Sequence, residues 1–446
     1  MIRLVFPGDS LSSLMQQFQQ EARESFALVL ARPVKIAARE WRLLVESVNI
    51  PADSDYEQRT QTAVRASSAF RLVHEKRARQ NGLSLVYCHS HPREEGIPTF
   101  SDIDDETELS LAAYCRDRIA SKIPHAALLV GSQGVRAREL GCSDPVEVME
   151  VGRRVIRWFP AGEIEIADAH DRQVRAFGKD GQRAIQGMRI AIVGLGGTGS
   201  VVAQQLAYLG VSRFLLIDPQ CLEDTNLNRV VGALPSDVGR TKVSIARRMI
   251  RRIVPSAHVE ARQGNILDEA TGAKLRDVDF VFCCTDSHGS RFFITQLAYQ
   301  YFVPCIDMGV VIQVHDQVVT YYGSRIQMLS PGTSCLVCTD GTLNPNEVRW
   351  DLSNEQERRA DPYFHGRADI KQPSVISLNS AAASQAVTMF LAAVAGVPGQ
   401  ARYQVVRGIK GDMRVLDDTP RPQCVNCSVD AFFGKGTLYK LPTRTR

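Results

Sequence analysis

A glycine-rich turn between a strand and a helix constrains the fold of this chain more than any other feature. An apolar strand, MRIAIVG, ends at Gly194, the turn continues through Gly196, Gly197 and Gly199, and a helical pattern follows. A second strand, RFLLIDP, completes a β-α-β unit of about 30 residues. Glycines let the backbone approach a phosphate closely, and the helix N-terminus adds a partial positive charge. Asp218 ends the second strand, where its carboxylate can bind ribose hydroxyls, so the pattern predicts a nucleotide-binding α/β domain.

The polar residues beyond the second strand narrow the choice of nucleotide. The turn alone fits NAD, FAD or ATP, but the next segment carries Asn226, Asn228, Arg229 and Lys242. A triphosphate is stabilised by such an arginine fork and lysine charge, whereas a dinucleotide site needs no such cluster. Asp286 follows a later strand, DVDFVFCCTD, and places a carboxylate where it could hold Mg²⁺. The sequence therefore predicts ATP and Mg²⁺ as the cofactors of this half.

The string IVGLGGTGS…LLIDPQCLEDTNLNR…VGRTKV…CCTDS resembles the ubiquitin-activating superfamily. The branch it is most similar to is that of the thiamine- and molybdopterin-biosynthesis adenylyltransferases (ThiF/MoeB type), and the resemblance covers residues 168–430. It implies a Rossmann-like domain in which Asp218 binds ribose and Asp286 binds Mg²⁺ or lies beside the α-phosphate. The phosphate ligands that it implies are Asn226, Arg229 and Lys242. Ser287 departs from the family pattern, which usually has Asn there.

A helical stretch before the first of these strands, His170 to Gln182, resembles the entry helix of the same enzymes. In that family an Arg of this helix reaches the ATP of the dimer partner. The resemblance therefore gives this role to Arg172 and implies a homodimer. The alternative is that Arg172 is a solvated charge on the helix.

Two CxxC pairs, Cys335 with Cys338 and Cys424 with Cys427, are the strongest ligand signal in the chain. Two such turns can place four thiolates tetrahedrally around Zn²⁺, which leaves no open position for water. Their separation is too long for spacing alone to pair them. In the resembled family two CxxC pairs this far apart close a structural zinc site, and the resemblance implies one here. The alternative is reduced thiols or a redox pair.

The segment between the two pairs lacks one feature of some family members. Members that form a thioester carry a Cys there, but residues 339–423 contain none. We expect its long polar part, residues 341–377, to be mobile. Cys221 and Cys305 are the only candidates elsewhere, and we expect each to be a core residue, so the sequence leaves open whether a thioester forms.

The N-terminal half carries a second metal-ligand pattern. His89 and His91 lie two residues apart at the end of a strand, so both point to one face. Asp104 can supply a third ligand and leave a fourth position for water, which is the catalytic form of a zinc site. A Glu must accept the proton of the water, and a Ser can donate to the developing oxyanion.

This pattern resembles the JAMM metalloprotease motif of the JAB/MPN fold, over residues 10–150. The resemblance implies that His89, His91 and Asp104 bind Zn²⁺, that Ser101 supports the oxyanion and that Glu24 is the general base. Glu21, Glu40 and Glu46 are poorer alternatives by position. Nine residues, 92–100, separate the second His from the Ser where the family usually has seven. The longer loop leaves open a second assignment, Thr99 with Asp102.

Length and composition agree with two α/β domains. A chain of 446 residues exceeds one ordinary core. We place a JAB/MPN-like domain at 1–160, a linker with the entry helix at 161–187 and the adenylyltransferase domain at 188–446. A net charge of +4 gives no excess for nucleic-acid binding, and we see no membrane span or signal peptide. Eleven Cys, an odd number and mostly single within strands, favour a reduced cytoplasmic protein.

These motifs predict a bifunctional enzyme that trims and then adenylates the C-terminus of a ubiquitin-like or sulfur-carrier-like protein. A downstream conjugating or sulfur-transfer protein would receive the product. The alternatives are an NAD(P)-dependent oxidoreductase, a non-catalytic adaptor that only binds such a partner, and a peptide-modifying adenylyltransferase without a carrier protein. The sequence names neither the carrier nor the pathway.

Overall fold

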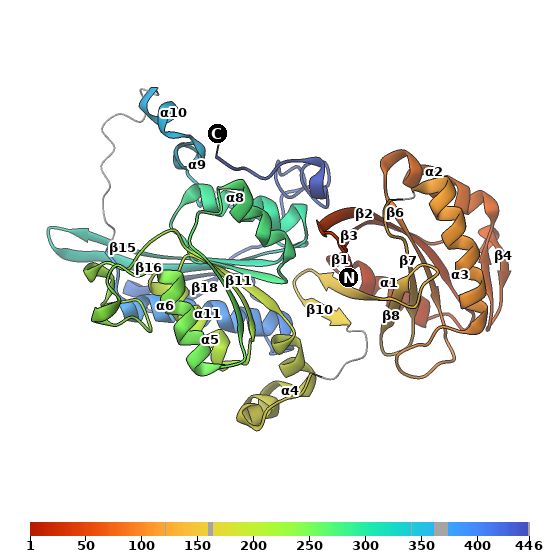
Figure 1. Ribbon diagram of the computed structural model, residues 1–446, viewed down its shortest axis with the longest axis horizontal. Helices are drawn as coiled ribbons and strands as arrows, with labels where there is room; N and C mark the ends of the chain where they lie inside the picture. The colour runs from red at the N-terminus through yellow and green to blue at the C-terminus, as the bar shows by residue number, and fades with distance from the viewer. Residues whose placement is uncertain (121, 159–163, 340, 361–372, 445–446) are drawn as a thin grey trace. The chain divides into compact units, whose positions relative to one another are not determined.

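The chain folds into two compact units, each with its own sheet (Figure 1). The structure is a computed structural model that describes residues 1–446 except 121, 159–163, 340, 361–372 and 445–446. Unit 1 comprises Met1–Glu163 and Gly434–Tyr439, and unit 2 comprises Ile164–Phe433 and Lys440–Arg446. The entry helix therefore belongs to unit 2.

Unit 1 is built on a sheet that closes on itself. Its strands are β1 (Ile2–Pro7), β2 (Phe26–Ala37), β3 (Glu40–Asn49), β6 (Ser84–Ser90), β7 (Ala126–Val130), β8 (Val135–Glu139), β9 (Pro145–Val151) and β10 (Val155–Trp158). Their order is β1-β3-β2-β6-β7-β8-β9-β10, and β1 also pairs with β9. The helices are α1 (Ser10–Gln19), α2 (Ser68–Asn81) and α3 (Asp102–Tyr114), and a separate hairpin joins β4 (Tyr56–Arg59) to β5 (Val64–Ala66).

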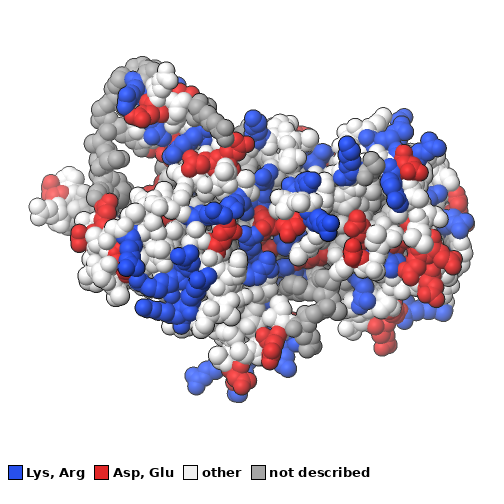
Figure 2. Space-filling view, viewed as in Figure 1, with Lys and Arg blue, Asp and Glu red and all other residues white. Residues whose placement is uncertain are grey.

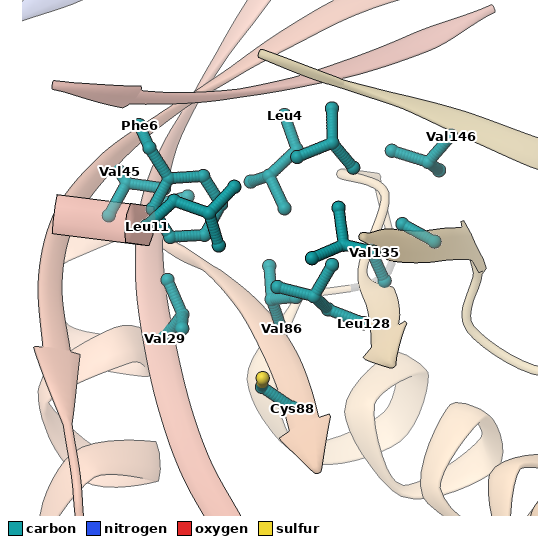
Figure 3. Close-up of a cluster of buried hydrophobic side chains, with 14 of the residues drawn as sticks. Leu4, Phe6, Leu11, Val29, Val45, Val86, Cys88, Leu128, Val135 and Val146 are labelled. Atoms are coloured by element: carbon teal, nitrogen blue, oxygen red, sulfur yellow. The ribbon is translucent and has the colours of Figure 1, made fainter. Parts of the chain in front are cut away.

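The two faces of this sheet carry separate cores because side chains alternate along each strand. On β6, Val86 and Cys88 enter one core together with residues of α1 such as Leu11 (Figure 3). Leu85 and Tyr87, on the other face, enter a second core with residues of α2 and α3. His89 and His91 continue this second face by the same alternation, so the strand period directs both rings toward the side of α3.

Unit 2 is a parallel sheet extended by antiparallel strands. Its strands are β11 (Arg189–Val193), β12 (Arg213–Ile217), β13 (His258–Arg262), β14 (Phe280–Cys283), β15 (Cys305–His315), β16 (Val318–Leu329), β17 (Tyr403–Arg407) and β18 (Asp412–Val415). The order is β13-β12-β11-β14-β15-β16-β17-β18; β13 to β15 pair in parallel and β15 to β18 antiparallel.

Helices cover both faces of this sheet. They are α4 (Asp171–Gln186), α5 (Gly197–Tyr208), α6 (Lys242–Ile253), α7 (Glu269–Gly272), α8 (His288–Gln300), α9 (Pro345–Leu352), α10 (Glu355–Ala360) and α11 (Ile376–Val394). Figure 1 shows α8 on one face and α5, α6 and α11 on the other. In the long polar segment after the first CxxC pair, the part that is described forms α9 and α10, while residues 361–372 lie outside the described residues.

Two helices of unit 2 have features that also occur in membrane proteins and in nucleic-acid-binding proteins. By length and composition alone α11 could cross a membrane, and among the described residues no other helix meets that test. Ten of its side chains are nevertheless buried in unit 2, where the helix lies against α5, β15 and β16. Figure 2 shows basic side chains gathered over α6. Four arginines lie on α6. Arg248 pairs with Asp237, and Arg247, Arg251 and Arg252 are exposed.

Candidate functional site

The glycine turn of unit 2 lies between β11 and α5, and close packing at two positions requires glycine. Gly194 has a φ of +88°, and a Cβ there would lie 2.7 Å from the carbonyl oxygen of Cys284. A Cβ on Gly199 would lie 1.9 Å from the carbonyl oxygen of Gly194. The turn therefore brings the start of α5 against the loop that follows β14, where Asp286 lies. Gly196, by contrast, has open space around its Cβ position.

Asp218, at the end of β12, is buried and holds this turn. Its Oδ2 accepts a hydrogen bond from the Leu195 backbone amide at 2.6 Å, and its Oδ1 accepts one from the Gln220 amide at 2.8 Å. The carboxylate thus fixes the turn as well as lying where ribose binding was predicted.

Arg229 lies over the glycine turn. Its Cδ would be 3.5 Å from a Cβ on Gly197, and its Nη1 donates to the Thr225 carbonyl oxygen and to Asn228 Oδ1 at 3.2 Å. Asn226 is buried, and its Oδ1 accepts from the Glu223 amide in a capping box. Asn226 therefore shapes the loop that presents Arg229.

Lys242 begins α6 and is buried beside the loop after β12. Its Nζ donates to Gln220 Oε1 at 2.6 Å, and Gln220 is bonded in turn to Asp218. The Lys242 ammonium is therefore held by Gln220, which lies two positions after the predicted ribose ligand, Asp218. Sequence reasoning missed Gln220, and its only signal was its position two residues after Asp218. Asp286 is exposed in the loop that contacts the turn.

Three other residues of unit 2 that the sequence singled out are not among the groups around the glycine turn. Arg172 is exposed on α4, and its reach toward a partner's nucleotide stays a prediction. Cys305 is buried, but Cys221 is exposed, so the expectation of a core position is wrong for Cys221. The reason is that β12 ends at Ile217 and Cys221 lies in the loop beyond it.

The four Cys of the CxxC pairs meet in one buried cluster. Cys335 Sγ lies 3.7 Å from Cys338 Sγ and 3.5 Å from Cys424 Sγ, and Cys338 Sγ lies 3.5 Å from Cys427 Sγ. The neighbouring Cys335 thiol and burial raise the pKa of Cys338 to about 12. Crowded thiols that resist ionisation need a cation to become thiolates, and four of them fit a closed zinc site.

In unit 1 the predicted metal ligands also come together. His89 Nε2 lies 3.0 Å from Asp104 Oδ1, and His91 Nε2 lies 3.7 Å from Asp104 Oδ2. One ligand atom from each of the three lies within 4.8 Å of the others. Burial would raise the pKa of Asp104, but hydrogen bonds from His89 and Ser101 outweigh it and hold the pKa well below its usual range. Two imidazoles and a carboxylate suit zinc.

Glu24 lies at the edge of this cluster, just before β2. Register explains its position, because Phe26 of β2 pairs with His89 of β6. The Glu24 carboxyl is buried, and burial raises its pKa, while the His89 and His91 rings lower it in part. The three alternative bases are placed differently: Glu21 and Glu46 form ion pairs with arginines, and Glu40 is exposed.

The structure brings Asp104 rather than Asp102 to the His pair. Ser101 caps α3: its Oγ accepts from the Asp104 amide and donates to Asp104 Oδ2 at 2.8 Å. Its role toward an oxyanion stays a prediction. Thr99 bonds instead to Glu94, a residue that sequence reasoning missed although it lies three positions after His91.

Comparison with known proteins identifies the family of unit 2. The ThiF family profile matches residues 170–426, more than half of the chain. The chain belongs to the ThiF family. Unit 2 is thus the ThiF-type adenylyltransferase domain, Rossmann-like, with a Cys₄ cluster. No comparison shows a JAB/MPN domain in unit 1.

Individual known proteins match parts of this chain. The molybdopterin-synthase adenylyltransferase of Escherichia coli K12 is 31% identical over 181 residues, which is 40% of this chain and 70% of that enzyme. Ubiquitin-like modifier-activating enzyme 5 of rice is 30% identical over 36% of this chain and 39% of its own length. The tRNA threonylcarbamoyladenosine dehydratase of Bacillus subtilis is 40% identical over 90 residues, 35% of its length. A crystal structure of E. coli MccB with MccA-N7isoASN is covered over 76% of its length and matches 59% of this chain, at 18% identity and a TM-score of 0.49.

Proposed function

We propose that unit 2 uses ATP and Mg²⁺ to adenylate the C-terminal carboxylate of a ubiquitin-like or sulfur-carrier-like protein. The observation that carries this proposal is the set of groups around the glycine turn: Asp218 holds the turn, Arg229 lies over it, and Lys242 bonds to Gln220, which is bonded in turn to Asp218. The names of the molybdopterin-synthase and ubiquitin-like-modifier relatives support this class of substrate.

Adenylation requires the protein mainly to position the reactants and to stabilise negative charge. A carboxylate oxygen of the carrier attacks the α-phosphorus of ATP, and the bond from that phosphorus to the bridging oxygen of the β-phosphate breaks. Pyrophosphate leaves with the electron pair, and the product is an acyl-adenylate. Arg229 and Lys242 stabilise the negative charge, and a Mg²⁺ held by Asp286 would add to that. The attacking carboxylate is already ionised, so no side-chain base is required.

Pyrophosphate exchange tests the adenylation. The full chain is given ATP, labelled pyrophosphate and a small ubiquitin-like protein that ends in Gly-Gly, and we expect label in ATP. Asp286→Ala should abolish the exchange, whereas Asp180→Ala, which removes an exposed carboxylate on α4, should leave it intact. Exchange that persists in Asp286→Ala argues against the role of that residue. A chain that gives no exchange rejects the proposal. A chain that prefers NAD to ATP also rejects it and favours an oxidoreductase.

We also propose that unit 1 is a zinc peptidase that trims or releases the C-terminus of the same carrier. The observation that carries it is the meeting of His89, His91 and Asp104 with a buried carboxyl, Glu24, beside them. Two imidazoles and one carboxylate leave a position open, as in catalytic rather than structural zinc sites.

In this proposal the side chains divide the work. When bound, zinc would act as a Lewis acid that makes water nucleophilic near neutral pH. Glu24 takes the proton of the water that attacks the amide carbonyl, and it returns a proton to the leaving amine as the carbon–nitrogen bond breaks. Ser101 would donate to the developing oxyanion, for which its hydroxyl must turn away from Asp104.

Cleavage of a carrier with a short extension after Gly-Gly tests this site. We expect Glu24→Gln and a metal chelator each to abolish cleavage, while Glu40→Gln, at an exposed position, retains it. Cleavage that survives in Glu24→Gln would reject the assignment of the base. If every variant and the unaltered chain are inactive while adenylation proceeds, unit 1 is a binding scaffold.

A further inference from the structure

The loop between the second predicted zinc ligand and α3 carries a carboxylate that faces the far side of that ligand's ring. Glu94 Oε2 lies 3.1 Å from His91 Nδ1. The other ring nitrogen of His91, Nε2, points to Asp104, where the ligand atoms converge. Glu94 thus contacts His91 on the side opposite the predicted metal position.

Glu94 is itself held by its own loop. The Thr99 amide and hydroxyl both donate to Glu94 Oε1, at 2.9 and 2.6 Å, which leaves Oε2 for the histidine. The Glu94 amide donates to the His91 carbonyl oxygen. The loop is also tied to the turn after β7, because the Gly96 amide donates to Ser132 Oγ. A carboxylate whose one oxygen is fixed by its own loop can fix the ring that its other oxygen contacts.

We propose that Glu94 is the positioning residue of His91: it accepts a hydrogen bond from the Nδ1–H group, directs Nε2 to the metal and so raises the affinity of the unit 1 site for zinc. This inference rests on the proposed zinc site. It makes the longer loop a part of the metal site rather than a passive bulge, because that loop supplies Glu94 together with its anchor, Thr99.

The physical reason lies in the two nitrogens of a neutral imidazole, of which one carries the proton and the other the lone pair. An acceptor at Nδ1 keeps the proton there, so Nε2 keeps its lone pair for the metal. The same contact limits rotation of the ring and makes Nε2 more basic. Loss of such an outer partner typically costs about 10- to 100-fold in metal affinity.

Cobalt titration of the full chain measures this effect. Co²⁺ in a site of two histidines and a carboxylate gives weak visible bands at shorter wavelength than the visible bands of thiolate-bound Co²⁺, which alone gives strong charge-transfer bands in the near ultraviolet. Both sites are therefore read separately in one sample, and the Cys₄ cluster serves as an internal reference. We expect Glu94→Ala to weaken Co²⁺ binding at the His site by about 10- to 100-fold, with the Cys₄ affinity unchanged.

Matched variants separate positioning from loss of fold or charge. Glu95→Ala removes the neighbouring exposed carboxylate of the same loop and should leave both affinities unchanged. Glu94→Gln keeps an oxygen acceptor and should fall between Glu94→Ala and the unaltered chain. Thr99→Val should weaken binding less than Glu94→Ala, and thermal unfolding of each variant checks that unit 1 is folded.

Two results would overturn the inference, and they are distinguishable. Equal Co²⁺ affinity at the His site in Glu94→Ala and the unaltered chain means that Glu94 only staples the loop, and the zinc site itself stands. An unaltered chain that shows no visible bands beyond those of the Cys₄ cluster under saturating Co²⁺ rejects the zinc site, and the role of Glu94 falls with it.

Discussion

At the scale of single residues, the glycines of the nucleotide turn are not equivalent. Gly199 is forced by its surroundings, because a Cβ there would collide with backbone that cannot move aside. Gly196 has an ordinary φ of −75° and nothing within 4 Å of its Cβ position. The motif has glycine at both positions for different physical reasons. Packing against the backbone requires glycine at position 199, and close approach of a phosphate is predicted to require it at position 196.

This difference predicts opposite outcomes for two alanine variants. Gly199→Ala should lower the free energy of unfolding by about 1–3 kcal/mol, because the added methyl overpacks the turn. Gly196→Ala should leave stability unchanged or raise it by about 0.4–1 kcal/mol, yet weaken ATP binding. Chemical denaturation and ATP titration of both variants provide the check. Similar loss of stability in both would contradict the packing argument.

At the scale of elements, the β4–β5 hairpin positions the proposed general base. The Glu24 amide donates to the Thr60 carbonyl oxygen, and Arg59 Nε donates to the Glu24 carbonyl oxygen. Arg59 Nη2 also donates to Ser25 Oγ, next to Glu24. The guanidinium is held in place by Asp53 and stacks over the Tyr56 ring. The short hairpin thus fixes the backbone of Glu24, whose carboxyl lies beside the predicted zinc ligands.

Arg59→Met should therefore reduce the kcat of the peptidase, by up to about 100-fold, with little change in KM for the carrier. Arg65→Met, on the other strand of the hairpin and exposed, is the control. Steady-state kinetics on an extended carrier give the answer. An unchanged kcat in Arg59→Met would show that β2 alone holds Glu24.

The Cys₄ cluster joins two loops that are distant in the chain, and its test belongs to the same scale. Cys338→Ser should remove about one zinc per chain and lower the unfolding temperature of unit 2. Cys142→Ser, at an exposed free cysteine, should change neither. Metal analysis with calorimetry measures both quantities. Full zinc content in Cys338→Ser would exclude Cys338 as a ligand.

At the scale of the whole molecule, the chain joins two units that are proposed to act on one flexible carrier tail. Tethering two sites that take the same tail raises the effective concentration of the trimmed product at the second site. A second copy of the chain is also predicted, because the resemblance gives Arg172 a role at the partner's nucleotide. These expectations concern assembly, and they are tested with complete chains.

Mixed dimers test the role of Arg172. Arg172→Ala and Lys242→Ala should each lose pyrophosphate exchange, and a co-expressed mixture should regain part of it, because one site of the mixed dimer keeps both residues. A mixture of Lys242→Ala with Asp286→Ala should stay inactive, because each chain's own site then lacks one of these two residues. If the first mixture stays as inactive as the second, Arg172 does not act across subunits.

The sequence alone determined those features that depend on short-range pattern. The strand–glycine–helix–strand period and the charges after it were enough to predict the α/β class of unit 2 and its ThiF relationship. The HxH spacing placed His89 and His91 on one face, because alternation along a strand is local. Local pattern also predicted the wrong surroundings for Cys221, because it does not show where a strand ends.

Tertiary structure decided every contact between segments that are far apart in the chain. The two CxxC pairs meet across a separation of 89 residues because the sheet and its loops bring them together. Register between β2 and β6 places Glu24 beside His89, and the fold of the loop turns Glu94 toward His91. Such contacts depend on how strands align and loops close, and no local period of a sequence encodes that alignment.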